Sequence, residues 1–273
     1  MIPYLDLPDW LRDRGWDHIG PIPVDSWGTL VVIGFVLGLE IARARGIKLG
    51  LDVRDVVDGI VFTVLSGFVG GHLVHVLAYH PEKLEEQGIR ALLEIWAGFS
   101  SFGGFIGAVA GIIVFYRYIR KVPFWPHADN MMFAFPFAWF FGRLGCFSAH
   151  DHIGKPTDFF LGVQFPGGTR YDLGLLEALV AFAISAVFLV LNRKPRRGGT
   201  YAATWALLYA PARFGLDFLR NTDLPTADVR WAGLTPAQWG CIVMFSAGLG
   251  LLGWMRLRAG EEGAPGSGLR APG

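Results

Sequence analysis

Gly142-Arg143-Leu144-Gly145-Cys146-Phe147-Ser148-Ala149-His150-Asp151-His152-Ile153-Gly154 is the stretch in which a long apolar run stops abruptly in a cluster of ionisable groups. An arginine at membrane depth needs an anionic partner, water or a lipid headgroup, so its presence there indicates a functional site. The alternative is an arginine that snorkels at a helix end, with the His-Asp-His sequence in a solvated loop. The glycines beside Arg143 favour the functional interpretation, because they let a backbone or a ligand approach closely.

The composition indicates a membrane protein. Of the 273 residues, 52% are hydrophobic and only 17% are charged, and the mean hydropathy is +0.40. Soluble domains carry about 25% charged residues, so a soluble fold is disfavoured. A net charge of +1 does not suggest a nucleic acid partner. Two cysteines, Cys146 and Cys241, are too few for a disulfide framework, and a single disulfide between them is the alternative.

Long apolar segments predict an all-α polytopic membrane protein with about seven transmembrane helices. The segments cover residues 27–42, 56–79, 101–116, 130–147, 173–191, 202–218 and 236–255. Six spans is the alternative, because several segments are near the lower limit of about 17 residues for crossing a membrane. We therefore expect three regions: an interfacial segment over residues 1–26, a transmembrane domain over 27–255, and a disordered tail over 256–273.

Lysine and arginine residues cluster after the first, third, fifth and seventh predicted spans. The positive-inside rule places these ends in the cytoplasm, so the N terminus is expected outside and the C terminus in the cytoplasm. The stretch around Arg143 and the end of the sixth span are then expected at the outer side of the membrane. His72 and His75, near the end of the second span, are expected on the same side.

A second signal lies in the sixth span, where Tyr209, Arg213, Asp217 and Arg220 recur at helical spacing. An arginine ladder inside a membrane is suited to an anion, and two guanidinium groups offer planar, bidentate contacts to a phosphodiester. The alternative is a structural salt bridge between Arg213 and Asp217, which are four residues apart. That pair would leave Arg220 and Arg143 without a role.

Three motifs in this order and spacing resemble the prolipoprotein diacylglyceryl transferases. They are Gly-Arg-Leu-Gly-x-Phe…Gly over 142–154, Ser-Ser-Phe-Gly-Gly-Phe-Ile-Gly over 100–107, and Tyr-x-x-x-Arg-x-x-x-Asp-Phe-x-Arg over 209–220. Asp129, Pro136 and Glu177 also fall where that family has like residues. The resemblance covers about residues 27–255 and implies seven spans with an outward N terminus.

The resemblance implies a transferase of the bacterial inner membrane whose active site faces the outer side. Such enzymes move the diacylglyceryl group of phosphatidylglycerol onto the lipobox cysteine thiol in the signal peptide of a pre-lipoprotein and release glycerol phosphate. The partners expected are thus this phospholipid, the pre-lipoprotein and membrane lipids, and no metal or other cofactor is expected. The catalytic residues expected are Arg143, Asp151, His150, His152 and Arg213. The lipid-binding residues expected are Gly142, Gly145, Gly154, Gly103, Gly104, Tyr209, Asp217, Arg220 and Glu177.

Several residues depart from the family pattern. Phe102 stands where the family has a histidine, Cys146 replaces an asparagine, and Trp27 stands in place of a tyrosine. Because phenylalanine cannot accept a proton, the base must be another group. His150 or His152, with an unperturbed pKa near ~6.5, is suited to this role at neutral pH, and Asp151 is the alternative. A second hypothesis is a non-catalytic or altered-acceptor paralogue that binds anionic phospholipid.

The histidines also allow a zinc-like site. Cys146, His150, His152, His72 and His75 supply enough nitrogen and sulfur ligands. Their spacing matches no familiar metal motif, which makes this the less favoured interpretation.

Overall fold

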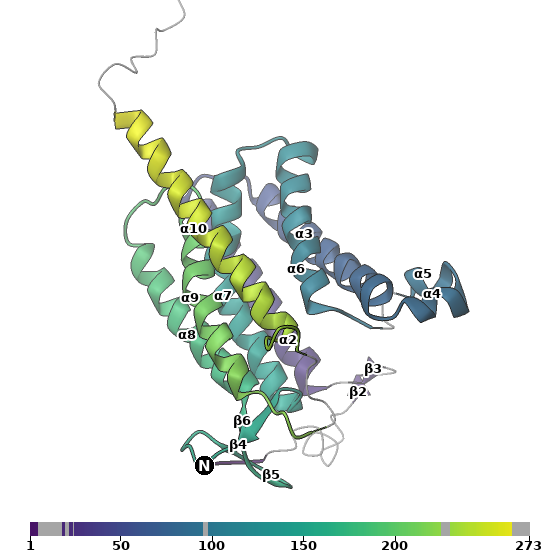
Figure 1. Cartoon of the computed structure of the whole chain (residues 1–273). Coiled ribbons are helices and arrows are strands. Elements are labelled where there is room, and N and C mark those ends of the chain that lie inside the picture. The colour runs from purple at the N-terminus through teal and green to yellow at the C-terminus, as the bar shows by residue number, and fades with distance from the viewer. Residues whose placement is uncertain (5–17, 20–21, 24, 95–97, 225–229, 264–273) are drawn as a thin grey trace, which may run out of the picture. The chain divides into compact units, whose positions relative to one another are not determined.

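The computed structural model describes residues 1–4, 18–19, 22–23, 25–94, 98–224 and 230–263. These residues are mainly helical, as predicted, and they include two small sheets that the sequence did not predict (Figure 1). They form two compact units, one made of Met1–Gly38 with Met132–Gly273 and the other of Leu39–Met131. Most of the predicted interfacial segment over residues 1–26 lies outside the described residues.

The unit Leu39–Met131 is based on a close pair of helices. Its elements are α3 (Val53–Val74), the π-helical turn η1 (His75–Tyr79), α4 (Pro81–Gln87), α5 (Arg90–Leu93), α6 (Ser101–Val114) and the π-helical turn η2 (Phe115–Ile119). A Cβ at Gly70 of α3 would lie 2.6 Å from the carbonyl oxygen of Gly103 in α6, and a Cβ at Gly67 would lie 3.3 Å from that of Gly104. Small residues permit this approach of two backbones. Packing thus accounts for Gly103 and Gly104, which were expected to bind lipid.

The other unit contains the second half of the chain. Its long helices are α7 (Phe124–Ala149), α8 (Leu173–Leu191), α9 (Thr200–Leu216) and α10 (Pro236–Gly263), and α2 (Ser26–Lys48) and α7 contribute residues to both units. Helices α7 to α10 lie side by side (Figure 1). Phe133 of α7 stacks with Phe188 of α8, and Phe135 of α7 meets Trp205 of α9 edge to face. Aromatic side chains therefore fill much of the core of this unit.

A four-stranded sheet in the order β1-β5-β6-β4 connects the end of α7 to the start of α8. Its strands are β1 (Ile2–Pro3), β4 (Ile153–Pro156), β5 (Val163–Phe165) and β6 (Gly168–Asp172), and β2 (His18–Ile19) pairs separately with β3 (Ile22–Pro23). In the hairpin of β5 and β6, Phe165 lies opposite Gly168, whose φ of 115° favours glycine. Because β4 follows α7 closely and pairs with β6, the sheet fixes the segment that contains Asp151 and His152.

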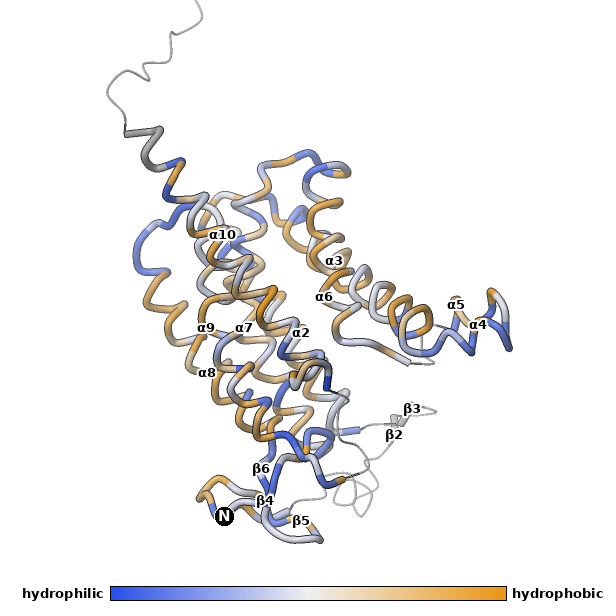
Figure 2. The backbone as a smooth tube through the Cα atoms, in the orientation of Figure 1, coloured by the Kyte–Doolittle hydropathy of each residue, from blue (hydrophilic) through white to orange (hydrophobic). Residues whose placement is uncertain are grey.

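Among the described residues, five helical segments are long and apolar enough to cross a membrane: Val53–Tyr79, Ser101–Ile119, Phe124–Ala149, Leu173–Leu191 and Pro236–Arg258. The predicted segment 173–191 coincides with α8. The other two predicted spans correspond to α2, which contains Glu40 and several basic residues, and to α9, which has 17 residues. The count of seven spans stays a prediction. Figure 2 shows hydrophobic residues along α8 and hydrophilic ones in the connection from α8 to α9.

Helix α10 continues past the predicted boundary at residue 255 and ends at Gly263. The first part of the predicted disordered tail is thus helical. Residues 264–273 lie outside the described residues.

Candidate active site

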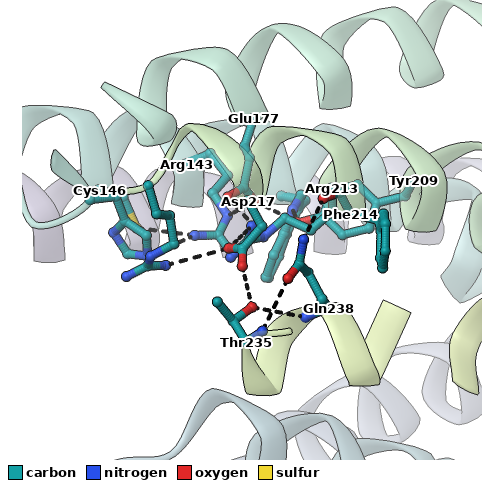
Figure 3. A network of polar contacts seen from close by, with 12 residues as sticks. Arg143, Cys146, Glu177, Tyr209, Arg213, Phe214, Asp217, Thr235 and Gln238 are labelled. Atoms are coloured by element: carbon teal, nitrogen blue, oxygen red, sulfur yellow. Dashed lines mark hydrogen bonds and ion pairs between the residues drawn. The ribbon is translucent and has the colours of Figure 1, made fainter. Parts of the chain in front are cut away.

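Glu177 is the centre of a buried network that joins three helices (Figure 3). Its side chain, on α8, is fully buried. Its Oε2 lies 3.1 Å from Nε of Arg143 on α7, and its Oε1 lies 3.0 Å from Nε of Arg213 on α9. The hydroxyl of Tyr209, also on α9, donates a hydrogen bond to Oε2 at 2.6 Å. A carboxylate with these partners has the ionic contacts that a buried charge requires.

The position of Arg143 follows from the last turns of α7. Its guanidinium lies over the ring of Trp139, one helical turn earlier, at 4.5 Å from the ring centroid. The indole Nε1 of Trp139 in turn donates to the Tyr209 hydroxyl at 3.2 Å. Because residues four apart share a helix face, one stripe of α7 supplies both the cation and its aromatic support.

Asp217 forms the second anionic centre, in the 3-10 turn η3 (Asp217–Leu219) after α9. Its buried Oδ1 accepts a hydrogen bond from Nη1 of Arg213 at 2.5 Å and lies 4.0 Å from Nη1 of Arg220. The hydroxyl of Thr235 donates to the other carboxylate oxygen. The predicted Arg213–Asp217 pair is therefore present, and it belongs to a larger network.

Thr235 and Gln238, at the start of α10, are site residues that the sequence analysis missed. The backbone N–H of Thr235 donates to Oε1 of Gln238 at 3.0 Å, and the backbone N–H of Gln238 donates to the Thr235 hydroxyl at 3.2 Å. The side-chain amide of Gln238 also donates to the carbonyl of Phe214 at 3.2 Å (Figure 3). Thr-Pro-Ala-Gln before an apolar run is the signature of a capping box, so a signal for both residues was present.

Together these residues form what we call the arginine–carboxylate cluster: Arg143, Arg213, Arg220, Glu177 and Asp217. A structural pair of Arg213 and Asp217 alone would leave Arg143 without a role, whereas in the structure Arg143 pairs with Glu177. Three guanidinium groups against two carboxylates leave one positive charge in excess. Such a cluster is suited to a ligand with a single negative charge.

A second group of side chains adjoins Arg143. Nη1 of Arg143 lies 3.8 Å from Sγ of Cys146 and 3.4 Å from Nε2 of His152. The other ring nitrogen of His152 bonds to a carboxylate oxygen of Asp151. The backbone carbonyl of His152 accepts a hydrogen bond from the N–H of Leu173 at 3.0 Å, which ties this histidine to the start of α8. We call Cys146, His152 and Asp151 the thiol–imidazole triad.

The surroundings of His152 shift its pKa upward. Burial lowers the pKa, but hydrogen bonds to Asp151 and to Cys146, with the charge of Asp151, outweigh burial and the opposing charge of Arg143, and they raise the pKa to about 9. The imidazole is then mainly protonated at pH 7. The expectation of an unperturbed value near neutrality is therefore wrong for His152.

His150, the other histidine proposed as a base, has a structural environment. Its Nδ1 lies 3.0 Å from Oδ2 of Asp172, whose Oδ1 accepts a hydrogen bond from the N–H of Leu175 and so caps α8. The His150 ring is buried and stacks on Tyr4 with 4.4 Å between the ring centroids. His150 also has a φ of 51°, at the point where α7 ends. These contacts give His150 a structural role, and His152 is the histidine next to Arg143.

The three glycines of the 142–154 stretch have different surroundings. A Cβ at Gly142 would meet nothing within 4 Å, so space is open beside Arg143. A Cβ at Gly145 would lie 3.2 Å from the ring of Trp27, and one at Gly154 would lie 2.7 Å from the carbonyl of Leu219. Gly142 is thus the one of the three where a ligand has room, while Gly145 and Gly154 allow close packing.

Two of the five residues considered for a zinc-like site have other partners in the structure. His72 faces the carbonyls of Gly98 and Ala91 through its two ring nitrogens, and His150 bonds to Asp172. Within the described part of the chain, Cys146, Asp151 and His152 form a group whose ligand atoms lie within 4.8 Å of one another. The adjacent Arg143 guanidinium opposes a cation there. Cys146 and Cys241 are both free thiols, so the alternative of a disulfide between them is not observed.

Comparison with known proteins adds independent information. A family profile described as prolipoprotein diacylglyceryl transferase matches residues 16–254. Similar proteins named phosphatidylglycerol–prolipoprotein diacylglyceryl transferase include that of Bordetella bronchiseptica, 32% identical over 247 residues that cover 86% of this chain and 92% of the relative. Those of Chromohalobacter salexigens (30% identical, 87% and 90% covered) and Mannheimia succiniciproducens (34% identical, 75% and 78% covered) are further examples. The matched range contains the arginine–carboxylate cluster and the thiol–imidazole triad.

Proposed function

The chain belongs to the prolipoprotein diacylglyceryl transferase family, an enzyme family, and we propose that it transfers the diacylglyceryl group of phosphatidylglycerol to the lipobox cysteine thiol of a pre-lipoprotein. Glycerol phosphate is the second product. The observation that carries this proposal is the arginine–carboxylate cluster, whose single excess positive charge complements the single negative charge of a phosphodiester. No cofactor is required for this reaction.

The arginines bind the phosphate of the lipid and stabilise the negative charge that develops on it during the reaction. Arg143 uses Nε for Glu177, and its Nη1 faces Cys146 and His152 of the thiol–imidazole triad. Arg213 and Arg220 share Asp217. The carboxylates and Tyr209 fix the guanidinium groups in advance, so little reorganisation accompanies binding.

The reaction needs a proton acceptor for the incoming thiol. Neutral His152 takes the thiol proton, and Asp151 orients the imidazole through the opposite ring nitrogen. The thiolate attacks the glyceryl carbon that carries the phosphate, a C–S bond forms, and the C–O bond to the phosphate breaks. The phosphate gains negative charge as the bond breaks, and Arg143 and Arg213 stabilise that charge more strongly in the transition state than in the bound lipid.

The site is proposed to face the outer side of the bacterial inner membrane. In the unit that contains the site, α8 and α10 both begin next to the cluster and end near basic residues, Arg193 to Arg197 after α8 and Arg256 and Arg258 within α10. The positive-inside rule places such ends in the cytoplasm. Residues 27–255 are the proposed transferase domain of a multi-pass membrane protein, which takes its donor from the surrounding lipids.

The second candidate function is binding of anionic phospholipid without catalysis, or with another acceptor. Phe102, at the position of the family histidine, is half exposed and has no proton-accepting group. This candidate predicts that phosphatidylglycerol binds while no glycerol phosphate appears.

The test is incubation of the purified protein with phosphatidylglycerol and a lipobox peptide, with a serine-substituted peptide as the matched control. We expect a thioether-linked diacylglyceryl peptide and an equal amount of glycerol phosphate, and no product from the serine peptide. Lipid binding measured on the same preparation separates the candidates. Tight binding without either product would contradict the transferase proposal and support the lipid-binding protein.

A further inference from the structure

The proposed reaction needs three groups at one place: a cation for the phosphate, a base, and an acceptor thiol. The chain itself has a thiol there. Sγ of Cys146 lies 3.8 Å from Nη1 of Arg143, the guanidinium proposed to bind the phosphate. Cys146 is three residues after Arg143 on α7, so both side chains project from one face of the helix.

Cys146 is also connected to a base. Its Sγ lies within 4.8 Å of a ring nitrogen of His152, and His152 in turn hydrogen-bonds to Asp151 through Nδ1. A nucleophile, a base in contact with it and a carboxylate that orients the base form the arrangement of activated thiols in cysteine enzymes.

The second cysteine of the chain lacks this environment. Cys241 is buried within α10, and among the described residues it lies outside the group of Cys146, Asp151 and His152. It is therefore an internal control, a thiol in the same unit that is not part of the thiol–imidazole triad.

From these contacts we propose that Cys146 is itself an acceptor of the diacylglyceryl group, which makes it a site of self-lipidation. The proposal rests on the proposed function, because it uses the same donor and the same cluster. The thiol proton passes to neutral His152, the thiolate attacks the glyceryl carbon of phosphatidylglycerol bound at Arg143, the C–S bond forms, and the C–O bond to phosphate breaks. Glycerol phosphate leaves with the bonding electrons, so no oxidant or other reactant is needed.

The adduct is a dead end for the chain that carries it. A thioether sulfur is a poor leaving group, so the diacylglyceryl group cannot pass on to a peptide. The group also occupies the space next to Arg143 that a second lipid would need. The acceptor peptide and Cys146 therefore compete for one bound donor, and self-lipidation inactivates the enzyme when acceptor is scarce.

The experiment is incubation of the purified full chain with phosphatidylglycerol at pH 9, with and without lipobox peptide, followed by intact and peptide mass spectrometry. Without peptide, we expect up to one diacylglyceryl group per chain, on the fragment that contains Cys146, and resistance of its linkage to neutral hydroxylamine. Excess lipobox peptide should slow formation of this adduct. Cys241→Ser should leave the adduct in place, whereas Cys146→Asn should remove it while the protein keeps a cooperative thermal transition.

The outcomes separate this inference from the proposed function. If the reaction with peptide gives modified peptide and the peptide-free reaction gives no adduct on Cys146, self-lipidation is overturned and the transferase proposal stays intact. An adduct on Cys146 without modified peptide supports self-lipidation and contradicts the proposed acceptor. Equal modification of Cys241 overturns the inference as non-selective alkylation, and absence of all products overturns both proposals. A hydroxylamine-sensitive adduct overturns the inference as well, because it indicates acyl transfer to a thioester.

Discussion

Raising the pH from 7 to 9 is expected to increase the rate of diacylglyceryl transfer steeply, because the proposed base must lose a proton before it can accept one. His152 has a pKa of about 9, set by its bonds to Asp151 and Cys146 against the effects of burial and of Arg143. Only the neutral imidazole has a lone pair available, so the rate should follow the fraction of His152 that is neutral.

The size of the effect follows from the titration. With a pKa of about 9, about 1% of the imidazole is neutral at pH 7 and about half at pH 9, which predicts a rise of about fifty-fold. An unperturbed histidine with a pKa of about 6.5 would already be about three-quarters neutral at pH 7, and the rate would rise by less than about 1.5-fold. Because the group interacts with Cys146 and Asp151, the measured midpoint belongs to the triad as a whole.

The same pKa shift has the opposite sign for stability. A histidine whose pKa is raised by folding stabilises the folded state fully below its unfolded value, and this contribution is lost as the pH rises through the folded value. The melting temperature in detergent should therefore fall between about pH 6.5 and about pH 9 while the rate rises. A single group then explains two trends in opposite directions.

The assay is the initial rate of transfer to a lipobox peptide at saturating phosphatidylglycerol, measured from pH 6 to pH 10. His152→Gln should abolish the rise of the rate with pH and lower the rate itself while the lipid still binds. His150→Gln is the matched neighbouring variant, and it should keep the rise with pH. Phe102→His should change the rate little, since His152 already serves as base. A flat profile, a midpoint near neutrality, or an unchanged step in His152→Gln would refute the assignment and direct attention to Asp151.

The remaining predictions concern the arginine–carboxylate cluster. Arg143→Lys should impair transfer almost as severely as Arg143→Ala, because lysine keeps the charge but loses the planar fork; near-normal turnover would refute a bidentate role. Glu177→Gln should lower the free energy of unfolding by about 3–5 kcal/mol, seen as a lower melting temperature, because it leaves two buried arginines with a neutral partner. Tyr209→Phe should cost about 1–3 kcal/mol through loss of its hydrogen bond to Glu177, and an unchanged melting temperature would contradict this. Replacing Arg213 and Asp217 together by apolar residues should leave a folded protein that no longer binds phosphatidylglycerol, whereas retained binding would limit the pair to a structural role.

Much of the fold was predictable because long apolar segments have few alternatives in a membrane. The backbone must satisfy its own hydrogen bonds there, so segments such as residues 173–191 become helices, and α8 has these bounds. The sheet was not predictable in the same way. Its strands have two to five residues, and their pairing depends on contacts between β1 and β5 that are far apart in the sequence. Local pattern carries little information about such pairs.

The candidate site was predictable in its residue types but not in its connections. Arg143 and Arg213 stood out because charge is costly in an apolar segment. Spacing along the chain could not assign Glu177 as the shared partner of both arginines, because the three residues lie on different helices. The two histidines beside Asp151 looked equivalent in sequence. The structure separates them: His150 has a positive φ at the end of α7 and its ring packs against Phe165 of β5, while His152 is next to Arg143.

Charge balance connects the stability of this site to its chemistry. If the cluster contained arginines alone, mutual repulsion in an apolar environment would oppose folding, and full neutralisation by carboxylates would leave no attraction for a phosphate. Glu177 and Asp217 neutralise two of the three charges and hold Arg143 and Arg213 in place before the lipid arrives. The remaining excess charge matches the phosphodiester. In the proposed reaction, the phosphate moves toward a second negative charge as the C–O bond breaks, and the fixed guanidinium groups interact with it more strongly than with the intact lipid. The same carboxylates that make burial of the arginines tolerable thus keep them oriented for the transition state, which is the state that catalysis must favour.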